Sequence, residues 1–370
     1  MKVGLISLGC DKNRVDSEIM LGLLIREGYT IVNQSQEADI IIINTCGFID
    51  DAKEESIDAI IEQAQYKKTG NCKLLVVTGC MAQRYPDQLI KEIPEIDAVV
   101  GTGKYTGILR VIDKCLKDDD SLVNVGSPEL PCLKDMPRVL TTPSHTAYLK
   151  ISEGCSNCCA YCVIPQLRGP HTSRPIDEVL DEAQKLVENG VREIILVGQD
   201  LTRYGIDLGG GLTLTKLLEE LVKLPQLTWL RLLYCYPDRV TDQLIDIIAR
   251  EEKICNYIDI PIQHINPAIL KRMNRHFSPS GIRSLLKSLR ERIPDIVLRT
   301  SFIVGFPGEG EEEFEELVDF VQEIQFNRLG VFTYSREEGT AAAGPHPSPF
   351  AFATMSDEYL INFTPQETRV

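Results

Sequence analysis

The sequence predicts an α/β fold in two parts, an open parallel sheet followed by an incomplete (β/α) barrel. Short runs of Ile, Leu and Val alternate with amphipathic stretches along most of the 370 residues. A proline-rich segment, residues 128–143, interrupts this alternation once. Strands that alternate with helices pair in parallel and are covered by those helices, and the interruption divides the chain into two domains.

The first domain is expected over residues 1–122, as a Rossmann- or flavodoxin-like sheet. Its predicted strands are 2–7, 39–44, 73–78 and 97–100, and its predicted helices are 15–27, 50–65, 83–92 and 105–116. Asp16 and Glu18 lie near the start of the first helix, where the helix dipole favours acidic side chains.

Three cysteines follow three of these strands, each beside a glycine: Cys10, Cys46 and Cys80. The carboxyl ends of parallel strands meet along one edge of a sheet, which is the usual ligand edge of open α/β folds. We therefore expect the three thiols to meet there and to hold an iron–sulfur cluster with a free iron. The alternative is three unrelated loop cysteines, and the repeated Gly–Cys pairing argues against it.

A linker is expected at 123–143, and a second domain at 144–342. Six strand candidates alternate with helical stretches: strands 147–151, 193–197, 228–233, 257–260, 296–301 and 329–333, and helices 176–188, 214–222, 242–249, 280–292 and 311–324. Barrel sites lie at the carboxyl ends of the strands. Gln199, His264 and Arg299 are predicted at such ends, although a satisfied loop histidine and an ordinary ion pair explain the last two equally well.

A cysteine-rich loop follows the first barrel strand. Cys155, Cys159 and Cys162 form a C-x3-C-x2-C pattern, and thiolates spaced in this way can face one soft metal centre. A cubane has four irons, so three cysteines leave one iron open to bind a small molecule. Cys158 also creates two abutting C-x2-C pairs, which suggest zinc, but such pairs cannot easily wrap one tetrahedral ion.

Composition narrows the partners and the compartment. The net charge of −15 disfavours broad binding to nucleic acid and suits a basic protein partner. No apolar run reaches the roughly 18 residues of a membrane-spanning helix, so we expect a cytoplasmic protein with no membrane association and reduced thiols. The remaining cysteines read as mostly structural: Cys72, Cys115, Cys132, Cys235 and Cys255.

Residues 1 to about 342 resemble the radical S-adenosylmethionine (SAM) methylthiotransferases, on motifs that match in order: SLGCDKNRVDSE, NTCGFIDDAKEES, GCMAQRYPDQL, EGCSNCCAYCVIPQLRGPHTSR, GQDLTRYG, PIQHINPAILKRMNR, FIVGFPGE and YSREEGTAA. The first two motifs look like the branch that modifies an aspartate of small-subunit ribosomal protein twelve. The runner-up is the transfer-RNA adenosine branch. Rivals from other classes are a non-catalytic iron–sulfur carrier and a zinc-binding interaction module.

The resemblance implies two 4Fe–4S clusters and SAM as cofactors. Cys155, Cys159 and Cys162 look like the ligands of the SAM cluster, with Tyr161 beside the SAM, and the three N-terminal cysteines look like the ligands of an auxiliary cluster that carries the sulfur. Gln199 and Arg299 are candidate SAM or substrate contacts. The implied partners are the ribosomal protein as substrate and an electron donor such as flavodoxin or ferredoxin.

The tail, residues 343–370, departs from the family pattern. It has no Lys, one Arg and four Pro, where family members continue into a small β-barrel (TRAM) domain that docks the substrate. We therefore expect a divergent tail without that domain, and weaker substrate docking.

Overall fold

The computed structural model describes residues 1–118 and 121–344. By its internal contacts the chain divides into two compact units that interleave along the sequence. Unit one comprises Met1–Ser156, Val163–Val191 and Val197–Gln199, and unit two comprises Asn157–Cys162, Arg192–Leu196 and the described residues from Asp200 onward. The expectation about the tail falls almost entirely on residues 345–370, which lie outside the described part.

Unit one is built on a six-stranded, fully parallel sheet. Its strand order is β2 (Thr30–Ile31), β1 (Lys2–Ser7), β3 (Ile40–Thr45), β4 (Leu74–Gly79), β5 (Ala98–Val100) and β6 (Leu122–Asn124). The four predicted strands are confirmed within one residue at each end. The two edge strands were not predicted because runs of two and three residues are too short to show a period.

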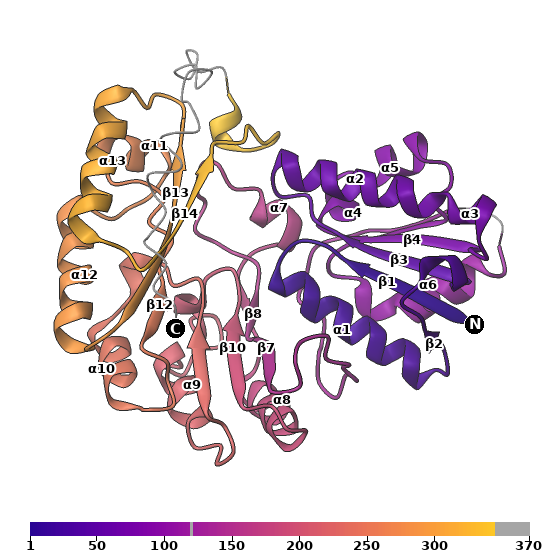
Figure 1. The fold of residues 1–370 in the computed structure, drawn as a ribbon, viewed down its shortest axis with the longest axis horizontal. Coiled ribbons are helices and arrows are strands. Elements are labelled where there is room, and N and C mark those ends of the chain that lie inside the picture. The colour runs from indigo at the N-terminus through magenta and orange to yellow at the C-terminus, as the bar shows by residue number, and fades with distance from the viewer. Residues whose placement is uncertain (119–120, 345–370) are drawn as a thin grey trace. The chain divides into compact units, whose positions relative to one another are not determined.

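Helices cover both faces of this sheet and bury every residue of its central strands β3 and β4 (Figure 1). Ile40 and Ile42 of β3 pack on one face with α1 (Asp11–Arg26) and α6 (Ile108–Cys115). Ile41 and Ile43 pack on the other, with α2 (Asp50–Ala64), α4 (Cys80–Arg84) and α5 (Pro86–Glu92). The short helix α3 (Tyr66–Thr69) follows α2. The doubly covered sheet confirms the predicted fold class of the first domain.

Unit one also contains the start of the predicted barrel. Its elements are β7 (Thr146–Lys150), β8 (Ser152–Glu153), α7 (Ile164–Arg168), β9 (Thr172–Ser173) and α8 (Ile176–Glu188), with β8 and β9 paired antiparallel. These elements make most of their contacts within the unit that holds the N-terminal sheet. The domain bounds at 122 and 144 stay predictions.

Unit two carries the rest of the (β/α) alternation. β10 (Glu193–Val197) pairs in parallel with β11 (Trp229–Leu232), and β12 (Tyr257–Asp259), β13 (Val297–Val304) and β14 (Arg328–Thr333) form a second parallel set. An isolated parallel bridge joins Leu230 of β11 to Ile254, which lies three residues before β12. The intervening helices are α9 (Leu214–Leu221), α10 (Asp242–Arg250), α11 (Pro267–Arg272), α12 (Pro279–Arg292) and α13 (Glu311–Ile324). This order confirms the partial barrel.

One predicted strand end is wrong. β13 runs on to Val304, so Arg299 is its third residue and lies opposite Asp259 of β12 instead of at the carboxyl end. The apolar residues Phe302–Val304 extend the strand, because Phe302 packs against Phe320 of α13 with ring centroids 6.2 Å apart. Among the described residues, no helix is long and apolar enough to cross a membrane.

Candidate functional site

Three loops at the carboxyl edge of the N-terminal sheet carry the first set of cysteines. Cys10 caps α1, Cys46 directly follows β3, and Cys80 opens α4. Their glycines allow the loops to pack closely. A Cβ on Gly9, which has φ of +80°, would lie 2.9 Å from the Cβ of Cys46, and one on Gly47 would lie 2.9 Å from the Cα of Met81. The structure thus brings the three predicted loops together.

The three thiols lie close enough to one another to influence one another's pKa. Burial raises the pKa of Cys46, and the neighbouring Cys10 raises it further. Burial raises the pKa of Cys80 to about 12, with Arg168 acting against this rise and Cys10 and Cys46 adding to it. A metal binds the thiolate, so metal binding at this edge must release protons.

No set of three His, Cys, Asp or Glu side chains in the described part of the chain converges closely enough to hold a single metal ion. An iron–sulfur cluster does not require such convergence, because each cysteine binds a different iron. The all-thiol donor set and the tightly packed Gly–Cys loops fit a cluster at this edge.

Asn13 and Arg168 join these loops to the chain around the second cysteine motif. The Asn13 amide donates to the carbonyls of Leu8 (3.0 Å) and Thr45 (2.9 Å), which fixes two of the loops. Its Oδ1 accepts from Arg168 and lies 3.9 Å from Sγ of Cys80. Neither residue was predicted from the sequence, because an Asn in a helix and an Arg before a Gly carry no distinctive spacing.

Arg168 belongs to a buried network of four charges. Its guanidinium contacts Asp16 (2.7 Å) and Glu153 (3.2 Å), and the Lys150 ammonium contacts the same two carboxylates. Burial would raise the pKa of Glu153, but Lys150 and Arg168 lower it to about 2. Glu153 also accepts from the Gln199 amide at 2.6 Å. The predicted contact residue Gln199 is therefore bonded to a residue that lies two positions before Cys155 in the sequence.

The expectation that Asp16 and Glu18 act through the helix dipole is wrong. Both lie beyond the first turn of α1 and are buried, at 3% and 0% exposure. Asp16 belongs to the network above, and Glu18 accepts from Arg138 and from the backbone and hydroxyl of Thr141. The carboxylates are therefore specific ion-pair partners, because a buried charge must be paired.

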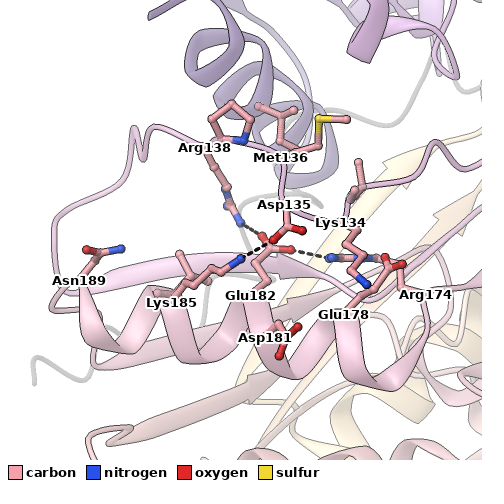
Figure 2. A pocket seen from close by; sticks show the side chains of 14 residues that line it. Lys134, Asp135, Met136, Arg138, Arg174, Glu178, Asp181, Glu182, Lys185 and Asn189 are labelled. Carbon is pink, nitrogen blue, oxygen red and sulfur yellow. Dashed lines mark hydrogen bonds and ion pairs between the residues drawn. The ribbon is translucent and has the colours of Figure 1, made fainter. Parts of the chain in front are cut away.

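A cavity of about 250 Å³ lies between residues 133–138 and α8 (Figure 2). Charged side chains of both signs line it, and they pair across it: Arg138 and Arg174 with Glu182 at 2.8 and 2.6 Å, and Lys185 with Asp135 at 2.9 Å. None of the predicted site residues lines this cavity. We regard its ion pairs as structural.

Glu182 supplies a test of that structural role. Burial alone would raise its pKa, but Arg174 and Arg138 lower it below the ordinary value. Its contribution to stability is thus complete above its unfolded pKa of about 4.3 and is lost as the pH falls through the lower folded value. Glu182→Gln should lower the free energy of unfolding by about 1.5–3 kcal/mol at pH 7, the range for hydrogen bonds to charged groups. The difference from the parent should narrow below pH ~4.

Urea unfolding at pH 7, 5 and about 3 measures this effect, because the contribution is lost only below the unfolded pKa of Glu182. Asp181→Asn is the matched control, because Asp181 is the exposed neighbour on the same helix. A Glu182→Gln deficit that is the same at every pH, or no larger than that of Asp181→Asn, would contradict the assignment.

The second cysteine motif spans residues of both units, and each part is held locally. In unit one, the Cys155 N–H donates to the Gly169 carbonyl at 3.0 Å, and Gly154, with φ of +75°, has no room for a Cβ, which would lie 2.1 Å from the Pro170 oxygen. In unit two, the Cys162 N–H donates to the Cys159 carbonyl at 3.1 Å.

Unit two supplies two further contacts to this loop that the sequence analysis missed. Arg275 Nη1 lies 3.7 Å from Cys159 Sγ, and the Asn274 amide donates to the Cys158 carbonyl at 2.7 Å. Cys158 adopts the left-handed region, with φ of +54°. Arg275 is held over the ring of Tyr236, 4.2 Å from its centroid, so the cation near Cys159 has a fixed position.

Tyr161 lies in an apolar cluster with Ala160, Met273 and Phe306. Its ring meets Phe306 edge to face, with centroids 6.4 Å apart. Burial raises its pKa well above the ordinary value, with Arg275 acting in the opposite direction. The tyrosine therefore stays neutral and anchors the loop between Cys159 and Cys162.

The remaining candidates have different surroundings. Arg299 forms an ion pair with buried Asp259 at 2.7 Å, and its side chain is 36% exposed. His264 is fully buried, accepts the Asn266 N–H at its Nδ1, and places Nε2 3.4 Å from Glu309. Gln199 Oε1 is buried and has no hydrogen-bond partner among the described residues.

Comparison with known proteins identifies the family to which this chain belongs. Residues 2–101 match the model of an uncharacterized protein family, UPF0004, and residues 149–321 match the radical SAM superfamily. The ribosomal protein uS12 methylthiotransferase RimO of Geotalea uraniireducens is 54% identical over 342 residues, which are 92% of this chain and 76% of that relative. The chain belongs to the RimO family. The RimO of Clostridioides difficile is 52% identical over 92% of this chain and 77% of its own length.

Solved structures support the fold of this RimO-family chain. The radical SAM methyltransferase TsrM from Kitasatospora setae superposes with a TM-score of 0.67 at 16% identity, over 92% of this chain and 76% of that one. The cobalamin-dependent radical SAM enzyme OxsB gives 0.62 at 14% identity, over 92% and 54%. Membership of the RimO family confirms the predicted class, a methylthiotransferase with a radical SAM domain.

Proposed function

We propose that the chain attaches a methylthio group to the β-carbon of an aspartate in ribosomal protein uS12. The observation that carries this proposal is identity above 50% with RimO relatives over 92% of the chain. The β-carbon C–H is too weak an acid for removal by a general base at neutral pH. When bound, two 4Fe–4S clusters and SAM supply the radical, sulfur and methyl chemistry that this bond requires.

The residues of the chain hold and shield these groups. We assign Cys155, Cys159 and Cys162 to the SAM cluster, and Cys10, Cys46 and Cys80 to the auxiliary cluster. The all-thiol loops, the partly buried Tyr161 and the fixed Arg275 near Cys159 support the first assignment. The mutual proximity of Cys10, Cys46 and Cys80 supports the second.

The two candidate contact residues take different places in this proposal. Gln199 has an unsatisfied buried oxygen available to a ligand donor. Arg299 stays a candidate substrate contact through the exposed third of its side chain. A flavodoxin or ferredoxin as electron donor and a cytoplasmic location complete the proposal, and the net charge of −15 favours a basic ribosomal protein over RNA.

Mass spectrometry provides the test. The reconstituted chain, incubated anaerobically with reductant, SAM and purified uS12, should add one methylthio group to one aspartate. Transfer RNA is incubated in parallel, because the transfer-RNA branch is the runner-up. Modification of transfer RNA with none on uS12 would overturn the proposed substrate, and SAM cleavage by neither mixture would favour the non-catalytic carrier.

A further inference from the structure

Arg168, the last residue of α7, is buried beside the N-terminal cysteines, at 3% exposure. Two other residues of this segment, Val163 and Leu167, pack directly on Cys80. The guanidinium donates to Asn13 Oδ1, the atom that lies 3.9 Å from Cys80 Sγ. The Arg168 guanidinium is thus fixed beside the loops of Cys10, Cys46 and Cys80 by its bond to Asn13, while Val163 and Leu167 pack on Cys80.

Among the buried charges around Arg168, its own guanidinium is the one that lies beside the Cys80 sulfur. Two carboxylates, Asp16 and Glu153, are shared between two cations, Arg168 and Lys150, so the network is neutral before any thiolate is counted. The groups that act most on Cys80 after burial are Arg168 and the other two cysteines, not the carboxylates. Thiolates at this edge therefore meet the positive side of the network.

We propose that Arg168 is a positioning residue for the auxiliary cluster, whose guanidinium offsets the negative charge that the three cysteine thiolates bring. This inference rests on the proposed assignment of Cys10, Cys46 and Cys80 as cluster ligands. The net charge near a cluster and the hydrogen bonds around its sulfurs set its reduction potential. Partners beyond the ligands also strengthen metal retention, typically by about 10- to 100-fold.

The test isolates the auxiliary cluster in the full chain with Cys155, Cys159 and Cys162 changed to Ala. In this background, Arg168→Gln should shift the reduction potential of the auxiliary cluster to a more negative value. Reduction would then add an electron to a cluster whose negative charge the guanidinium no longer offsets. Iron loss to a chelator should be faster by about 10-fold or more. Both readouts are independent of catalytic turnover.

Arg138→Gln is the matched control. Arg138 is also a buried arginine of unit one with two carboxylate partners, Glu18 and Glu182, and these carboxylates are the groups that act on its charge. It should leave the potential and the iron loss unchanged. Arg168→Lys keeps the charge and should restore most of the potential, which a purely structural role would not predict.

Arg168→Gln leaves two buried carboxylates with one cation, so the double variant Arg168→Gln/Asp16→Asn keeps the network neutral if the single variant fails to fold. Folding is checked by circular dichroism. A folded double variant with the potential and iron loss of its parent would overturn the proposal. A parent background that binds no iron would overturn the cluster assignment itself, and the role of Arg168 with it.

Discussion

Replacing Cys155, Cys159 and Cys162 together with Ala should abolish SAM cleavage and remove about half of the iron. Two 4Fe–4S clusters give about eight irons per chain after anaerobic reconstitution, and the triple variant should keep about four. We expect a complete loss of cleavage because, in the proposed assignment, SAM binds the open iron of the cluster that these three thiolates hold. Iron analysis and quantification of 5′-deoxyadenosine measure the two effects.

Cys158→Ala is the matched control for this change. Cys158 lies in the same loop, with φ of +54°, and an Ala there meets the same backbone conformation. The variant should keep its iron and its SAM cleavage. Loss of cleavage in Cys158→Ala equal to that of the triple variant would instead favour two C-x2-C pairs as the metal-binding unit.

Replacing Cys10, Cys46 and Cys80 with Ala should remove the other half of the iron, spare SAM cleavage and abolish methylthio transfer. The two triads belong to different motifs, and Asn13 holds the loops that carry Cys10 and Cys46. We therefore expect SAM cleavage to be independent of these three thiolates. Iron content, 5′-deoxyadenosine and mass spectrometry of uS12 are measured on one preparation.

Cys115→Ala and Cys132→Ala serve as controls, because they are free cysteines of the same unit outside the triad. Both should behave as the parent. An iron content that stays near eight in the triple variant would refute an auxiliary cluster at this edge.

The strands and most helices were predictable because their apolar periods are strong. β1, β10, α8 and α13 match their predicted ranges, and the Gly–Cys steps after β1, β3 and β4 located one edge of the sheet. What the sequence hides is the identity of buried polar partners. Asp16 and Glu18 have the pattern of a solvated helix face, and only long-range folding brings Lys150, Arg168 and Arg138 against them. Arg299 was misplaced for a related reason, since strand length depends on packing against α13.

The buried polar face of α1 has a consequence for the order in which this chain folds during its synthesis on the ribosome. The partner of Glu18, Arg138, is synthesised 120 residues later, and the partner of Asp16, Arg168, is synthesised 152 residues later. At elongation rates of about 5–20 residues per second, these delays are about 6–30 s. During that interval the nascent N-terminal segment carries carboxylates that it cannot bury. We therefore expect the first sheet to close only after α7 has emerged, so that the N-terminal thiols become an organised metal site late in translation.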